Sequence, residues 1–279
     1  SYGSLAYGGR RMDVRLREGF LIMKEFSEFI KRDIPEKGFV HFYFMGQAGF
    51  ILQDSDGFLL AYDLYLSDCC EREFGFKRLM PHLLGADELA FDAVLCSHGH
   101  YDHLDIDSAE AFLASPRTQM YVTQCGLEEL RKRSLLSDRV HLIRAGDHLA
   151  LGHCFTCDFV YCDHGDETPH AVGTLFTVGK KRIYAVGDSA YRDALIHEKT
   201  TGADLVILPI NGAFGNLNET EAAFLAKNLQ AGTVIPSHFW NFAEHGGNPH
   251  VFQQEAEKLG VKYLLMRQGE RLKIDTEKL

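Results

Sequence analysis

Long apolar runs are what the sequence most clearly lacks. No hydrophobic segment approaches the roughly 20 residues that a membrane-spanning helix needs, and the first residues lack the apolar core of a signal peptide. We therefore expect a cytoplasmic protein with no membrane partner.

Clustered positive charge is also scarce. The 279 residues include 29 Lys and Arg against 39 Asp and Glu, which gives a net charge of -10. The short basic run Arg131–Arg133 suits the solvated face of a helix. Because nucleic-acid binding needs clustered cations to neutralise phosphates, we expect no nucleic-acid partner. A small anionic substrate in a local pocket stays compatible with this charge, as does a homo-oligomer.

Cysteine usage excludes a secreted disulfide scaffold. There are 7 cysteines, an odd number, and their spacing lacks the regularity of a disulfide framework. Hydrophobic residues make up 46% of the chain, which is enough for a substantial core.

One stretch concentrates side chains that bind metals. The apolar run Phe91–Leu95 predicts a strand, and three histidines and an aspartate then fall within His98–His103. Alternate residues of an extended loop can converge on one ion, so His98 and His100 are expected to share a metal. Asp102 and His103 would turn toward a second metal beside it. The alternative is a solvated loop that happens to be rich in histidine.

Three later positions also place possible ligands where a strand ends. Asp188 follows Gly187 after an apolar run, where it could bridge two cations or cap a helix beginning near Ala190. His238 follows the predicted strand Thr233–Pro236. The first metal needs a third histidine, and both His164 and His170 are candidates. We favour His164 because it directly follows a strand, as the other ligands do.

These motifs resemble those of the metallo-β-lactamase superfamily. The His98–His103 stretch is similar to its His-x-His-x-Asp-His signature, and Tyr184–Asp188 and Val234–His238 match two further landmarks in the expected order. Within the superfamily the likeness is to the L-ascorbate-6-phosphate lactonase group, through Gly187–Tyr191 and Val234–Phe242, followed by Asn248 and Pro249. The resemblance implies an α/β fold, the four-layer αββα sandwich, formed by residues 1–279 as one domain.

The resemblance also implies a chemistry. It predicts two divalent metal ions per chain, Mn or Zn with Fe as a further candidate, on seven ligands: His98, His100, Asp102, His103, His164, Asp188 and His238. A metal-bound hydroxide would be the nucleophile, and Asp102 would be the catalytic residue that moves protons. The predicted activity is hydrolysis of a small phosphorylated sugar lactone such as L-ascorbate 6-phosphate. The alternatives are a metal-dependent phosphodiesterase and a non-catalytic metal-binding or regulatory protein.

Residues beside these ligands are candidates for the substrate site. They are Tyr191, Arg192, Asn211, Gly212, Trp240 and Asn241. Asp63 ends a predicted strand and is expected to support the ligands, whereas His245 and His250 are expected at the surface or the rim of the pocket.

The remaining periodicity predicts mixed α and β structure. Residues 1–11 are expected to be a loose arm or a cloning remnant, and residues 14–34 a helix that ends before Pro35. Further helices are predicted at 106–114, 127–133, 190–198, 219–229 and 249–259. Strands are predicted at 39–45, 49–53, 58–62, 91–95, 119–123, 140–143, 153–162, 172–178, 182–186, 205–209, 233–236, 262–266 and 271–274.

Overall fold

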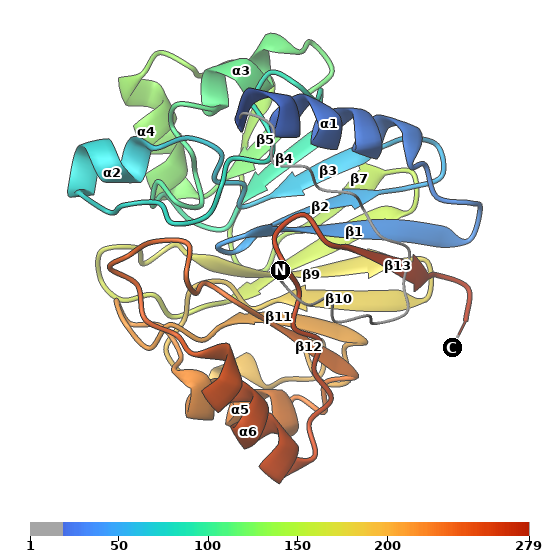
Figure 1. Cartoon of the computed structure of the whole chain (residues 1–279), viewed down its shortest axis with the longest axis vertical. Coiled ribbons are helices and arrows are strands. Elements are labelled where there is room, and N and C mark those ends of the chain that lie inside the picture. The colour runs from blue at the N-terminus through green and yellow to red at the C-terminus, as the bar shows by residue number, and fades with distance from the viewer. Residues whose placement is uncertain (1–18, 279) are drawn as a thin grey trace, which may run out of the picture.

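The first of two β-sheets contains seven strands within residues 19–278, the part of the chain that the computed structural model describes (Figure 1). In spatial order they are β13 (Arg271–Asp275), β1 (Phe39–Gly46), β2 (Gly49–Gln53), β3 (Leu59–Tyr62), β4 (Ala93–Cys96), β5 (Gln119–Val122) and β6 (Val140–Leu142). Strands β3 to β6 are parallel to one another, and β2 is antiparallel to both β1 and β3.

The second sheet packs against the first and has six strands in the same described region. In spatial order they are β12 (Thr233–Ser237), β11 (Leu205–Pro209), β10 (Lys181–Ala185), β9 (Val172–Val178), β8 (Phe155–Tyr161) and β7 (His148–Gly152). Strand β9 is antiparallel to both β8 and β10, and β10, β11 and β12 are parallel to one another. The carboxyl ends of β8, β10, β11 and β12 therefore lie at the same edge of this sheet.

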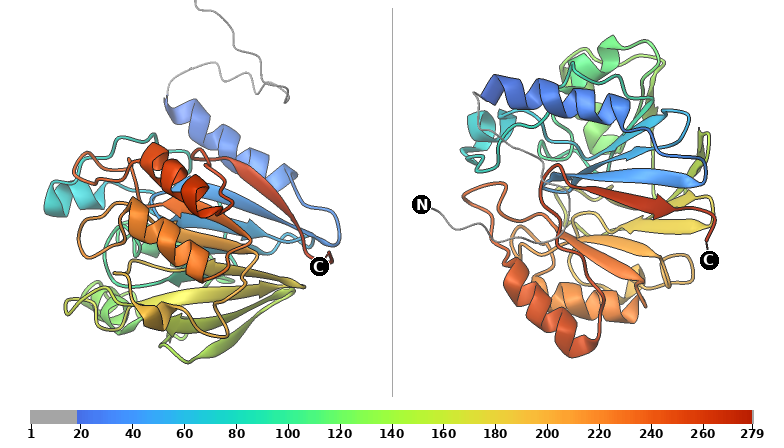
Figure 2. Two further views of the ribbon diagram at one scale, coloured as in Figure 1. Left: turned by 90° about the horizontal axis from the view of Figure 1, so that it is seen from below. Right: turned by 45° about the vertical axis from the view of Figure 1, so that its right-hand side comes forward.

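Helices cover the outer face of each sheet (Figure 2). The first sheet carries α1 (Gly19–Arg32), α2 (Cys69–Phe74), α3 (Ala109–Ala114) and α4 (Gln124–Lys132), and the second carries α5 (Glu219–Asn228) and α6 (Pro249–Leu259). The predicted four-layer αββα sandwich is confirmed.

Alternation along the strands explains why the layers hold together. In β1, Phe42 and Phe44 point into the core between the sheets, whereas Tyr43 and Met45 pack under the helices of the first sheet. Successive side chains of a strand face opposite ways, so a strand that is apolar at nearly every position suits a sheet buried on both faces. Three buried clusters result, one at each boundary between layers.

Some predicted elements differ from the structure. Residues 190–198 were expected to be a helix, but they contain only a 3-10 turn, Asp193–Leu195. The amide of Ala190 donates to the carbonyl of Asp163, and Arg192 is extended, so the helix cannot start there. Residues 262–266 form an isolated bridge to β12 rather than a strand.

One predicted strand begins at a later residue, and two elements of the structure were not predicted. The strand predicted at 153–162 begins at Phe155, because Gly152 and His153 have positive φ angles and make the turn of a hairpin with β7. Strand β7 and helix α2 were not predicted. The helix predicted at 14–34 is observed as α1 within its described part, and residues 1–11 lie outside the described residues. All 7 cysteines are free thiols.

Candidate metal centre

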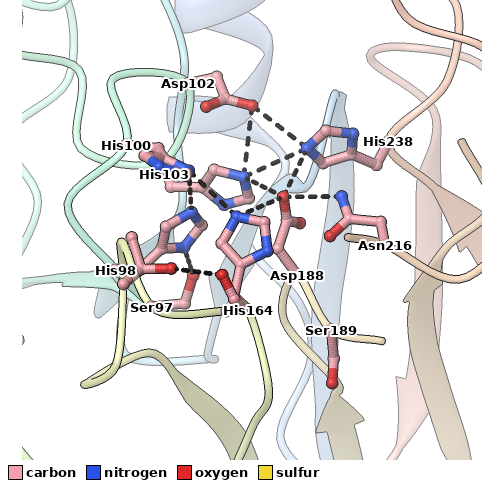
Figure 3. A network of polar contacts seen from close by, with 12 residues as sticks. Ser97, His98, His100, Asp102, His103, His164, Asp188, Ser189, Asn216 and His238 are labelled. Carbon is pink, nitrogen blue, oxygen red and sulfur yellow. Dashed lines mark hydrogen bonds and ion pairs between the residues drawn. The ribbon is translucent and has the colours of Figure 1, made fainter. Parts of the chain in front are cut away.

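The seven predicted ligands follow strands that end at one edge of the sandwich. The segment His98–His103 follows β4, His164 follows β8, Asp188 follows β10, and His238 follows β12. Parallel strands in a sheet present their carboxyl ends at the same edge, so loops far apart in sequence meet there. Figure 3 shows their side chains pointing toward one another.

His98, His100 and His164 form one group of convergent ring nitrogens. The Nε2 atom of His98 lies 3.0 Å from Nδ1 of His100, which lies 3.1 Å from Nε2 of His164. Their candidate ligand atoms all fall within 4.8 Å of one another. His170 is exposed and does not belong to this group.

Asp102, His103 and His238 form a second group beside the first. The Oδ2 atom of Asp102 is 3.3 Å from Nε2 of His103 and 3.2 Å from Nε2 of His238. The side chain of His103 is fully buried, and that of His238 nearly so. Two imidazoles and a carboxylate suit a borderline divalent cation.

Asp188 lies between the two groups. Its Oδ2 atom is 3.0 Å from Nε2 of His238, 3.3 Å from Nε2 of His103 and 3.8 Å from Nε2 of His164. Its other oxygen, Oδ1, is buried and has no hydrogen-bond partner among the described residues. An unpaired buried carboxylate oxygen is costly unless a cation satisfies it. The donor set therefore fits divalent metals shared across Asp188.

A buried hydrogen-bond chain fixes which ring nitrogens face the centre. Nδ1 of His103 donates to Oδ2 of Asp63 at 2.7 Å, and the Ser97 hydroxyl donates to the same oxygen at 2.6 Å. The Ser97 oxygen can then accept from Nδ1 of His98 at 3.0 Å. In the neutral form of each ring, these contacts place the proton on Nδ1, so Nε2 is the atom left to bind a metal. Asp63 supports the ligands, as expected from the sequence.

Two amides hold the carboxylates and were missed in the sequence. Nε2 of Gln47, directly after β1, donates to Oδ2 of Asp102 at 2.8 Å. Nδ2 of Asn216 donates to Oδ2 of Asp188 at 2.9 Å and to Oδ1 of Asn211 at 3.1 Å. Neither amide belongs to a recognisable motif. The position of Gln47 at the end of a strand, like that of Asp63, was the available signal.

Burial and charge divide the histidines into two kinds. Burial lowers the pKa of His98, His100 and His164, which favours the neutral imidazole. Burial alone would also lower the pKa of His238, but the negative charges of Asp188 and Asp102 outweigh it and raise the pKa to about 9. The pKa of His103 is raised for the same reason.

A cavity of about 550 Å³ opens over the candidate ligands His100, Asp102, His164, Asp188 and His238. Its lining also includes aromatic side chains and further carboxylates. The aromatic side chains come from Phe74, Phe76, Tyr101, Phe214 and His245, and the carboxylates from Asp163, Asp166 and Glu167. These phenylalanines were not predicted, because nothing in their local sequence distinguishes them from core residues.

Of the residues predicted to contact the substrate, one lines the cavity and the others do not. Arg192 lines the cavity, with its Nε atom 2.6 Å from Oδ2 of Asp163. Tyr191, Asn211, Gly212, Trp240 and Asn241 are not among the lining residues. The ring of Tyr191 packs near Phe224, Trp240 is exposed beside Phe239, and Asn241 is buried behind the site.

His245, expected from the sequence at the surface or the rim of the pocket, lines the cavity and packs directly against the ligand His238. Its ring stacks on that of His238, with centroids 5.0 Å apart and planes 9° from parallel. Nδ1 of His245 lies 3.3 Å from Nε2 of Gln47. Burial and the neighbouring His238 lower the pKa of His245 to about 4.

In the described part of the chain, no helix is both long and apolar enough to cross a membrane.

Comparisons with known proteins agree with this geometry. A family model described as the beta-lactamase superfamily domain matches residues 65–239. A UPF0173 metal-dependent hydrolase from Bacillus cereus (strain AH187) is 30% identical, in an alignment covering 65% of this chain and 82% of the relative. One from Bacillus thuringiensis (strain Al Hakam) is 28% identical with the same coverage.

Solved structures share the fold. Igni18, a metallo hydrolase from Ignicoccus hospitalis, has a TM-score of 0.69 at 19% identity and covers 85% of this chain and 98% of its own. YhfI from Bacillus subtilis has a TM-score of 0.64 at 22% identity, covering 84% and 99%. An isothiocyanate hydrolase from Delia radicum gut bacteria has a TM-score of 0.65 at 20% identity, covering 85% and 99%. The chain belongs to the metallo-β-lactamase superfamily and is a metal-dependent hydrolase of that fold.

Proposed function

We propose that the protein is a dinuclear metal-dependent hydrolase that opens a ring ester, a lactone. His98, His100 and His164 would hold one metal, and Asp102, His103 and His238 the other, with Asp188 bridging them. The observation that carries the proposal is the position of Asp188: its Oδ2 lies within 3.8 Å of Nε2 atoms from both groups, while Oδ1 is buried without a partner among the described residues.

Two divalent metals bound there would lower the pKa of a shared water toward neutrality and polarise the carbonyl under attack. The chain's own residues then organise the reaction. Asp102 faces the cavity and can accept a proton from the attacking water and return it to the leaving oxygen. The Gln47 amide fixes the orientation of that carboxylate. Buried Asp63 and Asn216 hold the ligands without reaching the cavity.

A carbonyl ester suits the cavity better than a phosphodiester. Three carboxylates line it besides the candidate ligands Asp102 and Asp188, and Arg192, the one Lys or Arg among the described lining residues, is paired with Asp163. A phosphodiester anion would meet like charge at the entrance, whereas a neutral ester would not. The phosphate of a sugar lactone such as L-ascorbate 6-phosphate meets the same obstacle, so the proposal concerns the ring ester itself.

A non-catalytic role would predict the loss of one or more ligands. The chain retains all seven candidates, and a cavity leads to them. This combination favours catalysis over a purely structural or regulatory metal site.

Metal content and substrate choice together test the proposal. Elemental analysis should give about two divalent metals per chain, because seven ligands exceed what one tetrahedral ion takes. A ratio of one, unchanged after adding manganese or zinc, would contradict the dinuclear centre. The substrate panel contains neutral lactones, a phosphorylated lactone, a generic phosphodiester and RNA. A small isothiocyanate joins it because a neighbour of the same fold is named for that substrate.

Lactone turnover should require the bridging carboxylate. Asp188→Asn should reduce the rate at least about 100-fold, since the bridge orders both metals. Asp204→Asn is the matched control, because Asp204 pairs with Lys181 and does not line the cavity. Turnover of the phosphodiester alone, abolished by Asp188→Asn, would show that the metal centre works on a different ester.

A further inference from the structure

An aromatic wall, formed by Phe74, Phe76, Tyr101 and Phe214, runs along one side of the cavity. Ring centroids are 5.3 Å apart between Phe74 and Tyr101, 6.1 Å between Phe74 and Phe76, and 5.6 Å between Phe76 and Phe214. The rings come from the end of α2 with the loop after it, the metal-binding loop, and the loop after β11. Three separate segments thus contribute to one continuous apolar surface.

Two rings of the wall are left open to water. Phe74 is 57% exposed and Phe214 is 56% exposed. Phe76 beneath them is partly buried and also contacts the ring of His245 at 5.3 Å. Exposed phenyl rings gathered at the mouth of a cavity are typical of a surface that a ligand covers.

Three further lining residues, which we call the acidic lip, are Asp163, Asp166 and Glu167 of the loop after β8. Asp166 and Glu167 are exposed, and Asp163 is partly exposed and holds Arg192 in an ion pair. An anionic substituent near the lip would meet these charges, and Arg192, the one Lys or Arg among the described lining residues, is already paired. A neutral substituent would escape this repulsion and could cover the exposed rings.

We propose that the natural substrate is an uncharged ester or lactone with an aromatic or branched-alkyl substituent that lies on the aromatic wall, while the acidic lip disfavours anionic analogues. This substrate class rests on the proposed function, since the ester must reach the metal centre. It differs from the small anionic substrate that the sequence led us to expect.

A matched pair of lactones tests the substrate class. One γ-lactone carries a phenyl substituent, and the other carries a carboxylate on the same ring. The metal-loaded enzyme should prefer the phenyl lactone by more than about tenfold in kcat/KM, since an apolar contact is worth roughly 10- to 200-fold in discrimination. Preference for the carboxylated lactone would overturn the inference but leave the proposed lactonase activity standing.

Substitutions in the wall locate the contact. Phe214→Ala and Phe74→Ala should each raise KM for the phenyl lactone about tenfold and leave kcat nearly unchanged, because the ring binds substrate and transition state alike. The matched control is Phe224→Ala, which removes a ring that is 48% exposed on α5 and does not line the cavity. Equal KM changes in all three variants would contradict the wall as the binding surface.

The acidic lip has its own test. Glu167→Gln should raise kcat/KM for the carboxylated lactone several-fold, about threefold or more for one removed surface charge, while the phenyl lactone is little affected. Glu110→Gln removes another exposed carboxylate outside the cavity and serves as control. An equal effect of both changes would assign the discrimination to overall charge rather than to the lip.

Equilibrium binding separates failure of this inference from failure of the proposed function. A phenyl-substituted lactam of the same ring resists hydrolysis, and its Kd can be measured by calorimetry on the metal-loaded protein. Phe214→Ala should weaken binding about tenfold, and Phe224→Ala should not. If no lactone is turned over but Phe214→Ala alone weakens lactam binding, the aromatic wall is an apolar binding site and the proposed lactonase activity is wrong. If the lactam does not bind, the inference is refuted.

Discussion

The Nδ1 atom of His103 lies 2.7 Å from Oδ2 of Asp63, and both side chains are completely buried. Asp63 directly follows β3 and His103 follows β4, two neighbouring parallel strands, so the contact is a consequence of strand order. A buried carboxylate that accepts from the far nitrogen of a ligand histidine sets its tautomer and its ring orientation.

Replacing Asp63 should therefore weaken the metal centre without removing any ligand. Asp63→Asn should lower metal affinity about 10- to 100-fold, the usual effect of losing such a partner. Competition with a chromophoric chelator would measure it. Asp92→Asn is the control, since Asp92 precedes β4, accepts the amide of Leu59 through Oδ2 and belongs to none of the candidate metal-binding groups of the described residues. Unchanged affinity in Asp63→Asn would show that the ring of His103 is positioned by packing alone.

The choice between His164 and His170 leads to a second prediction. His164→Ala should lose about one metal per chain and nearly all activity, because His164 completes a group of three imidazoles. His170→Ala should retain both metals, since His170 is exposed outside that group. Metal analysis and turnover of both variants check this. Metal loss in His170→Ala with retention in His164→Ala would transfer the ligand role.

A third prediction concerns the core between the sheets. Phe176 of β9 is fully buried, with its ring centroid 5.9 Å from that of Phe50 and 5.7 Å from that of Tyr62. Phe176→Ala should lower the free energy of unfolding by about 3–5 kcal/mol through lost burial and a cavity. Urea unfolding of the metal-free protein is the measurement.

Phe224→Ala supplies the comparison for that experiment, since it removes an exposed ring from α5. It should change the free energy of unfolding by less than about 0.5 kcal/mol. Similar losses in the two variants would mean that the core between the sheets is not what stabilises the sandwich.

The sequence predicted much of this molecule because its signals are local. The apolar run in Phe39–Met45 and the dense ligands in His98–His103 can be read from neighbouring residues, and both proved informative about the structure. The sequence offered two candidates for the third histidine, and the position of His164 directly after a strand favoured it over His170. The placement of ligands after strands followed from the same rule for each of them.

Other features depend on contacts that only the fold creates. Gln47 reaches Asp102 across 55 residues of sequence, and Phe214 meets Phe76 from another layer of the sandwich. An isolated glutamine or phenylalanine has no spacing pattern that marks it. The missing helix at 190–198 has the same origin, because the backbone of Ala190 is bound to Asp163 after β8.

The last prediction follows from the charges around His238. Burial alone would lower its pKa, but Asp188 and Asp102 raise it to about 9, and they raise the pKa of His103 as well. The His238 imidazole, with a pKa of about 9, is therefore protonated at pH 7 in the metal-free protein. A metal must displace that proton, so binding at pH 7 should release at least about one proton per chain. Calorimetry in buffers with different ionisation enthalpies would measure the proton release.

The raised pKa of His238 also determines how the free energy of unfolding changes with pH. A histidine whose pKa rises from 6.5 to about 9 on folding stabilises the metal-free protein fully below 6.5, and this stabilisation is lost as the pH rises through 9. The free energy of unfolding of the metal-free protein should thus fall between pH 6.5 and 9, while metal affinity rises over the same range. Chemical unfolding with and without metal at several pH values measures both. A metal-free protein that became more stable across this range would show that His238 is neutral before the metal arrives.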